Sequence, residues 1–352
     1  MLGKRSPKLS DPFPFHRGVH PVEGELLSSY LLRLAVGHSA DPYRFYSYLL
    51  PGIQVWNRDI DRGGSEAVSA LLVDRCGLPP LAVERMCLRE YSKAIEGPCP
   101  DGSRYRGTWI NPIGIFHRIR VLSGLQVCPI CLAEDGIYRR IWRLSFVTHC
   151  PVHLVPLYAA CPVCKAPIVP HRQLAGTTLC HHCHADYVAS WSGWDQGCPC
   201  PLSQQELLSA LSGTPVPTLS DPVPIADLAR GVTLLRNWGM LRTPEQAKGH
   251  AIETCSGLAR WVYFDLIHEL VSEWPESMGL LNVKGRISLP TFERCSPPVW
   301  LQCIANQLPA TARPRGLRKK APLAAFLRGL GLTPPAGWRE KRALALLKAA
   351  LK

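Results

Sequence analysis

The clearest periodic pattern of apolar residues in the N-terminal half lies between residues 24 and 35. Its apolar side chains recur three and four positions apart, at Leu27, Tyr30, Leu31 and Leu34. This spacing puts them on one face of a helix and predicts that this face is buried. Arg33 interrupts the apolar run, and we expect its side chain to reach solvent or an acidic partner.

The same period predicts three further short helices, over residues 43–50, 66–76 and 81–91. Turn-forming pairs separate them, namely Pro51-Gly52, Gly63-Gly64 and Pro79-Pro80. Asp59 and Asp61 lie between the first two helices, at a spacing that can serve acid–base or metal chemistry. Because no other potential metal ligand lies nearby in the sequence, we interpret the pair as part of a solvated turn in which an aspartate side chain caps the backbone.

The C-terminal half returns to helical periodicity after a stretch rich in proline. Four prolines and no regular period occur between residues 213 and 224, and we place a Pro-rich linker at 201–224. Beyond it, apolar spacing predicts helices, including a long one that starts with a cap at Thr243 and ends near Trp274.

The net charge of +13 is concentrated at the C-terminal end. Residues 309–352 contain eleven lysines or arginines and one acid, and so carry +10 of the total. Such a segment has the electrostatic character of a nucleic-acid-binding region. Its two helical stretches, about 322–330 and 338–351, fit either a helix-turn-helix variant or a plain amphipathic pair. We assign nucleic-acid binding to Arg313, Arg315, Arg318, Lys319, Lys320, Arg339, Lys341 and Arg342.

Eight cysteine and histidine residues fall at metal-ligand spacing. The first set is C-x2-C, a gap of 18 residues and C-x2-H, and the second is C-x2-C, a gap of 15 residues and C-x2-C. Two ligands three positions apart on a tight turn can point at one ion, and a second such pair completes a tetrahedron. The predicted ligands are Cys128, Cys131, Cys150 and His153 for one zinc ion, and Cys161, Cys164, Cys180 and Cys183 for another.

These predicted zinc sites are structural, because four protein ligands leave no coordination position for a substrate. The second ligand set has alternatives, since Cys198 and Cys200 lie close downstream and three histidines surround the last pair, at His181, His182 and His184. Between the ligand pairs of the first set, Tyr138, Trp142 and Phe146 suit a short helix or a strand and predict a small core beside the metal.

Length and composition limit the classes of protein to which the chain can belong. A chain of 352 residues with 46% apolar content fits a soluble protein of two or more domains. No apolar run approaches the length of about 18 residues that a membrane span needs, and the basic N-terminus lacks the apolar core of a signal peptide. We therefore expect a cytoplasmic protein.

No enzyme class gains support from motifs. The sequence has no G-x4-G-K-[ST] phosphate loop, and no H-x-E paired with P-C-x-x-C as in zinc deaminases. Redox chemistry would use one C-x-x-C pair instead of several. We therefore predict a protein that is not an enzyme.

The motifs collected so far resemble those of the TniQ family, also called TniQ/TnsD, of transposon target-selection proteins. The resemblance covers about residues 16–185. It is carried by the block from His20 to Ala35 and by Arg58-Asp59-Ile60-Asp61. The cysteine-rich part adds the block from Cys128 to Asp135, then Tyr138, Trp142-Arg143-Leu144, Cys150-Pro151-Val152-His153 and Cys161-Pro162-Val163-Cys164.

The resemblance implies a mainly α fold with small zinc-finger or zinc-ribbon modules. The expected layout is a flexible leader (1–20), an N-terminal helical TniQ domain (21–127), a tandem zinc-finger region (128–200), the Pro-rich linker (201–224) and a basic helical C-terminal domain (225–352).

In function, the resemblance implies a non-enzymatic adaptor for DNA transposition. Such an adaptor links a target-recognition device to an AAA+ ATPase regulator of the TnsC/TniB type, which recruits the transposase. The device is target DNA itself, a resolution-site protein or, in a CRISPR-associated transposon, a Cascade-like effector complex, and some relatives act as homodimers. We expect the charged residues Arg58, Asp59 and Asp61 to contact the partner.

Two other functions remain open from the residues alone. One is a zinc-containing, sequence-specific DNA-binding regulator unrelated to transposition. The other is a zinc hydrolase or nuclease. The helix motif between residues 24 and 35 favours the adaptor over the DNA-binding regulator.

Overall fold

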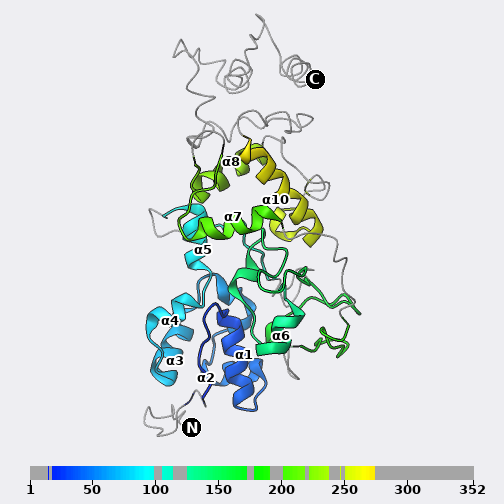
Figure 1. Cartoon of the computed structure of the whole chain (residues 1–352). Coiled ribbons are helices and arrows are strands. Elements are labelled where there is room, and N and C mark those ends of the chain that lie inside the picture. The colour runs from blue at the N-terminus through cyan, green and yellow to red at the C-terminus, as the bar shows by residue number, and fades with distance from the viewer. Residues whose placement is uncertain are drawn as a thin grey trace, which may run out of the picture. The chain divides into compact units, whose positions relative to one another are not determined.

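The computed structural model describes residues 15, 18–98, 105–113, 125–172, 178–190, 201–218, 222–237, 246 and 250–273 (Figure 1). The chain divides into two compact units. The first takes in the described residues of Met1–Lys93 and Tyr105–Cys200, and the second those of Ala94–Arg104 and Pro201–Lys352. The N-terminal helices and the cysteine-rich region therefore belong to one unit.

The described residues are mainly helical, as predicted. The α-helices are α1 (Leu27–Gly37), α2 (Pro42–Leu49), α3 (Glu66–Cys76), α4 (Pro80–Arg85), α5 (Arg89–Glu96), α6 (Pro129–Asp135), α7 (Leu202–Leu211), α8 (Ile225–Asn237) and α10 (Gly257–Ser272). Short 3-10 turns are η1 (Val55–Asn57), η2 (Ile60–Arg62), η3 (Arg140–Arg143), η4 (Pro170–Arg172) and η5 (Ile252–Thr254). Within this part of the chain, the β structure consists of isolated antiparallel bridges.

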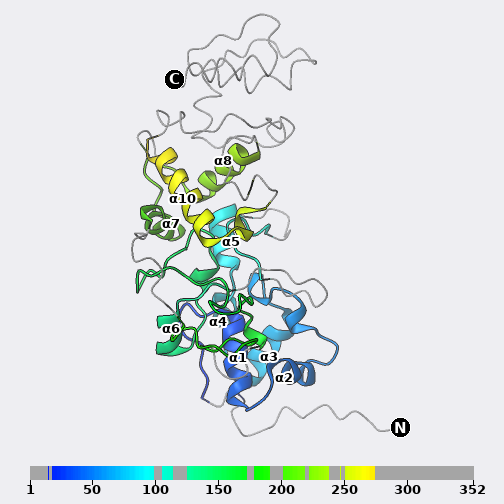
Figure 2. The ribbon, with the colours of Figure 1, turned by 90° about the vertical axis from the view of Figure 1, so that its right-hand side faces the viewer.

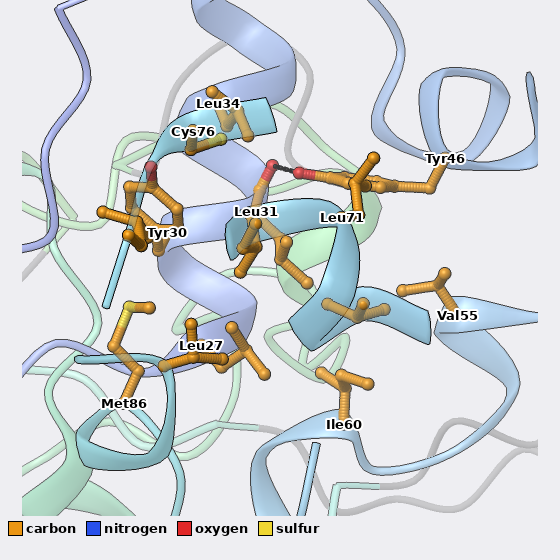
Figure 3. Close-up of a cluster of buried hydrophobic side chains, with 14 of the residues drawn as sticks. Leu27, Tyr30, Leu31, Leu34, Tyr46, Val55, Ile60, Leu71, Cys76 and Met86 are labelled. Carbon is orange, nitrogen blue, oxygen red and sulfur yellow. Dashed lines mark hydrogen bonds between the residues drawn. The ribbon is translucent and has the colours of Figure 1, made fainter. Parts of the chain in front are cut away.

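Helix α1 is the centre of the first core. Its apolar face is buried as the sequence predicted, and α2, α3 and the turns η1 and η2 surround it (Figures 1 and 2). The Tyr46 hydroxyl of α2 donates a hydrogen bond to the Leu31 carbonyl at 2.8 Å, within the cluster drawn in Figure 3. Helix α3 ends at Gly77, whose φ of 67° lies in the left-handed region that glycine adopts readily.

The prediction of one helix over residues 81–91 is wrong, because the chain breaks between α4 and α5. Met86, Cys87 and Leu88 are buried at the break. The Met86 carbonyl accepts the Leu27 N–H at 3.0 Å, and the Leu88 N–H donates to the Asp61 carbonyl at 2.7 Å. Tertiary hydrogen bonds therefore replace the helical ones that a continuous helix would make.

The second unit packs α10 against α7, and α7 against α8 (Figures 1 and 2). His268 of α10 lies 2.9 Å from Glu206 of α7. The long helix predicted between Thr243 and about Trp274 is not continuous, because residues 250–256 are outside any α-helix and Ser256 caps α10 by accepting the Ala259 N–H at 3.2 Å. Thr243 itself lies outside the described residues. Residues 201–224 are not a plain linker, since they contain α7 and a backbone-paired bridge between Val216 and Val223.

Candidate metal centres and their link to helix α1

The first tetrad consists of Cys128, Cys131, Cys150 and His153, whose donor atoms all lie within 4.8 Å of one another. The Cys131 and Cys150 sulfurs are 3.6 Å apart, and His153 Nδ1 lies 3.2 Å from the Cys131 sulfur. Thiolates bound at about 2.3 Å to one tetrahedral zinc ion lie about 3.8 Å apart. The four donors are thus spaced so that they could bind one metal ion.

Two different local structures present these donors. Cys128 directly precedes α6 and Cys131 lies in the first turn of that helix, which begins at Pro129. Cys150 begins a tight hairpin that places His153 three residues later. The first tetrad therefore combines a helix start with a hairpin, and each supplies two donors.

A carboxylate supports the histidine of this tetrad. His153 Nε2 lies 3.2 Å from Oε1 of Glu134 on α6, which leaves Nδ1 directed at the three sulfurs. A carboxylate in this position fixes the ring orientation of a metal-binding histidine. A hydrogen bond with Cys128 lowers the pKa of the Cys150 thiol below its ordinary range, which favours the thiolate form that binds metal.

The second tetrad consists of Cys161, Cys164, Cys180 and Cys183, again with all donor atoms within 4.8 Å of one another. The sulfurs of Cys161 and Cys183 are 3.7 Å apart, and those of Cys164 and Cys180 are 3.6 Å apart. These spacings also suit one tetrahedral ion. In contrast to the buried cysteines of the first tetrad, Cys164 is partly exposed and Cys183 is exposed.

One hairpin occurs three times in this region, beginning at Cys150, Cys161 and Cys180. In each copy the cysteine N–H donates to the carbonyl five residues later, and the cysteine carbonyl accepts the N–H from four residues later, at 2.7–3.0 Å. The residue four positions after the cysteine has a left-handed φ in every copy: 56° at Leu154, 60° at Lys165 and 59° at His184. Glycine would adopt this conformation without strain, whereas these side chains do not.

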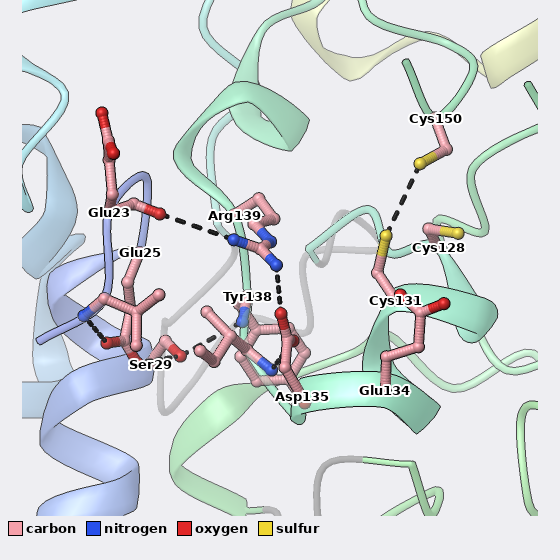
Figure 4. Close-up of polar contacts among 12 residues, drawn as sticks. Glu23, Glu25, Ser29, Cys128, Cys131, Glu134, Asp135, Tyr138, Arg139 and Cys150 are labelled. Carbon is pink, nitrogen blue, oxygen red and sulfur yellow. Dashed lines mark hydrogen bonds and ion pairs between the residues drawn. The ribbon is translucent and has the colours of Figure 1, made fainter. Parts of the chain in front are cut away.

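Backbone and side-chain hydrogen bonds join the start of α1 to the loop that follows α6. The Leu26 N–H donates to the Tyr138 carbonyl at 2.9 Å. The Ser29 hydroxyl accepts the Tyr138 N–H at 3.1 Å and donates to Glu25 at 2.8 Å (Figure 4). The loop therefore connects α1 to the helix that carries two donors of the first tetrad.

Glu25 is fully buried and anchors this junction. Its carboxylate accepts a hydrogen bond from Arg33 at 2.7 Å and another from the Val22 N–H at 3.1 Å. The expectation of an acidic partner for Arg33 is confirmed. A buried carboxylate needs such partners, because leaving it unpaired would cost the full desolvation penalty.

The interpretation of Asp59 and Asp61 as a solvated turn is wrong. Asp61 is fully buried, and it accepts hydrogen bonds from the Ser28 N–H at 2.7 Å and hydroxyl at 2.9 Å. Arg143, which is 1% exposed, lies 2.9 Å from Asp61 and also pairs with Asp59. This buried cluster fixes turn η3 to the first turn of α1.

The cluster also corrects the expected partner contacts. A buried Asp61 cannot touch a partner, and Asp59 is committed to Arg143, whereas Arg58 is exposed and remains a candidate. Sequence reasoning missed the role of Arg143. The available signal was an arginine inside the apolar Trp142-Arg143-Leu144 run, the same pattern as Arg33 in α1.

The structure places the remaining predicted residues as follows. His181 is half-buried beside the second tetrad, while His182 and His184 are exposed there. The aromatic side chains of Tyr138, Trp142 and Phe146 are buried, and Trp142 lies in turn η3. Outside the described residues lie Cys198, Cys200, the possible helix-turn-helix, and the predicted nucleic-acid contacts Arg313, Arg315, Arg318, Lys319, Lys320, Arg339, Lys341 and Arg342.

Comparison with known proteins gives one family. Residues 16–157 match the family model described as TniQ. The matched segment contains α1, the Asp61–Arg143 cluster and all four donors of the first tetrad, and ends before the second tetrad. No curated protein matches the chain.

Proposed function

We propose that this chain, which is a TniQ family protein through residues 16–157, acts as a non-enzymatic adaptor in DNA transposition. The adaptor links a target-recognition device to an AAA+ ATPase regulator of the TnsC/TniB type, and thereby to the transposase. The observation that carries the proposal is the TniQ match, over a segment in which α1 and the first tetrad form one hydrogen-bonded unit.

We propose that the protein binds two structural zinc ions. Cys128, Cys131, Cys150 and His153 hold one, and Cys161, Cys164, Cys180 and Cys183 hold the other. Each set offers four protein donors of the type zinc prefers, which leaves no coordination position for a substrate. Zinc therefore stabilises the fold here instead of supplying chemistry.

In this proposal the target is selected by the basic C-terminal segment and by partner molecules. The basic residues between Arg313 and Arg342 would bind target DNA through its phosphates. A Cascade-like CRISPR effector complex or a second copy of the chain would be further partners, and the complex would assemble on DNA in the cytoplasm. Among the helices that the structure describes, none combines the length and the hydrophobicity that a membrane span requires.

The proposal is tested by combining a pull-down with a transposition assay. The tagged full chain should retain the AAA+ regulator encoded in the same locus. Deleting the gene of this chain should abolish targeted insertion while leaving the transposase intact. Targeted insertion at the wild-type frequency after deletion would contradict the adaptor role. Nuclease or ATPase activity of the purified chain, lost when a tetrad cysteine is replaced, would favour an enzyme instead.

A further inference from the structure

An exposed aromatic and basic surface lies on α2 and on the loop that follows it. Residues 42–58 contain no acidic residue. The tyrosine side chains of this stretch include Tyr48, which is 77% exposed, and Tyr43, which is 46% exposed. Ile53 is also exposed, at 40%. Because the Tyr48 ring is about three-quarters exposed, its burial contributes little to the stability of the fold.

The helical geometry puts these side chains on one side of α2. At 100° per residue, positions 43, 44, 47 and 48 fall within an arc of about 140°, opposite Phe45, Tyr46 and Leu49. Tyr46 is buried, and the partly buried Phe45 stacks on Phe15 against the core, so the orientation of the helix is fixed. The loop adds its own residues, because the Tyr43 hydroxyl donates to Gln54 at 3.3 Å.

Two arginines on this surface have no ion-pair partner among the described residues. They are Arg44 and Arg58, both exposed. Arg33, Arg62, Arg139, Arg140 and Arg143, in contrast, each pair with a carboxylate. Arg44 also lies in the first turn of α2, where the helix dipole disfavours a cation. Neither arginine therefore has an evident role in folding.

We propose that Tyr43, Arg44, Tyr48, Ile53 and Arg58, here called the α2 surface, dock an acidic surface of a protein partner. Tyrosine and arginine are, with tryptophan, the residues enriched among those that contribute most of the binding energy of protein interfaces. Carboxylates on the partner would complement the two arginines, and an apolar patch between these carboxylates would cover the tyrosine rings and Ile53. The inference rests on the proposed function, in which the AAA+ regulator is the first partner to test.

A protein partner fits this surface better than a nucleic acid does. Sequence-independent binding of a single strand uses a basic groove that follows several phosphates, and its affinity depends on the number of cations. The α2 surface has two arginines beside three exposed apolar or aromatic side chains. This ratio of charged to apolar side chains is typical of a protein-interface hot spot, in which a few charged residues surround aromatic side chains that insert into the partner.

The experiment measures binding of the purified full-length, metal-loaded chain to the regulator encoded in its locus. Tyr48→Ala and the pair Arg44→Glu with Arg58→Glu should each weaken binding about tenfold or more. Arg85→Glu on α4 is the matched control, because Arg85 is also exposed and has no ion-pair partner among the described residues, but lies outside the α2 surface. Metal content and circular dichroism should be unchanged in all variants.

The outcomes separate the two proposals. If the wild-type chain does not bind the regulator, the proposed function fails. If the wild type binds and the α2-surface variants bind equally well, only the inference is overturned. Loss of single-stranded RNA or DNA binding in the variants, with regulator binding intact, would assign the surface to nucleic acid, and loss of self-association alone would assign it to a second copy of the chain.

Discussion

At the scale of single residues, buried charges determine how the N-terminal half is assembled. Asp61 and Arg143 are 82 positions apart in sequence and meet in the core, where Ser28 of α1 supplies two more hydrogen bonds. A buried ion pair adds little over an apolar pair of the same shape, yet removing one partner is costly because the other charge stays buried. The cluster therefore specifies the fold more than it stabilises it.

Replacing one carboxylate tests this view. Asp61→Ala should lower the free energy of unfolding by about 3 kcal/mol, since Arg143 loses one of its two carboxylates and two Ser28 donors lose their acceptor. Urea unfolding of the metal-loaded protein measures the change. Arg58→Ala is the matched control, because its side chain is exposed, and it should leave stability unchanged. A loss of under about 1 kcal/mol for Asp61→Ala would show that the cluster is not critical.

His171 should make the first unit sensitive to mild acid. Its ring stacks on Trp56 at 5.2 Å, and burial lowers its pKa to about 4, against about 6.5 in an unfolded chain. Between these values the unfolded chain binds a proton that the folded chain does not. Stability should therefore fall as the pH drops from 6.5 towards 4, by at most about 1.4 kcal/mol per pH unit.

The measurement is urea unfolding of the wild type and of His171→Phe between pH 7 and pH 5, because phenylalanine keeps an aromatic ring against Trp56. The variant should lose part of the pH slope. Any contribution from the metal ligands is common to both proteins and cancels in the difference. Equal slopes in wild type and His171→Phe would rule out His171 as the source.

At the scale of elements, the three hairpins share a geometry that their sequences do not favour. Each has a side chain in the left-handed position, which costs about 1–2 kcal/mol relative to a residue without a Cβ. Hydrogen bonds to the cysteine that begins each hairpin hold the conformation in place. Both metal ligands of each hairpin directly precede the strained residue in sequence, so they would be fixed by it in turn.

Lys165→Gly should relieve this strain in the second hairpin. After the larger entropy of an unfolded glycine is subtracted, we expect a gain of about 0.5–1 kcal/mol and a slower loss of metal to a chelator. Lys165→Ala is the control, since it removes the same charge but keeps the Cβ. If the glycine variant is no more stable than the alanine variant, the backbone at this position is not strained.

The sequence predicted elements well where a local signal was sufficient. The period of Leu27, Tyr30, Leu31 and Leu34 identified α1, and ligand spacing identified residues that the structure gathers into two tetrads. The break between α4 and α5 depends on hydrogen bonds to Asp61 and Leu27 that no local pattern contains. Asp61 looked like a solvated turn for the same reason, because Arg143 is distant in sequence.

At the scale of the whole molecule, the two tetrads have different consequences for the rest of the chain. The first is connected through α6 and Tyr138 to Ser29 and Glu25 at the start of α1 (Figure 4). The second lies in hairpins outside the matched TniQ segment. Loss of metal from the first tetrad should therefore disturb the core, and loss from the second should remain local.

A graded chelator titration tests this difference. The zinc-loaded chain should contain two zinc ions by elemental analysis, and the first to leave should come from the second tetrad, because the exposed Cys183 gives a chelator direct access. Amide exchange of α1 should stay slow after this loss. Removal of the second ion should speed exchange in α1, since the loop carrying Tyr138 would lose its support.

Matched variants identify which ion is which. Cys183→Ser should contain one zinc ion and keep α1 protected, whereas Cys131→Ser should expose α1 even with the second tetrad occupied. If Cys131→Ser leaves exchange in α1 unchanged, the hydrogen bonds at Tyr138 hold the helix without the metal. In that case the TniQ segment would fold on its apolar core alone, and zinc would stabilise only the hairpins.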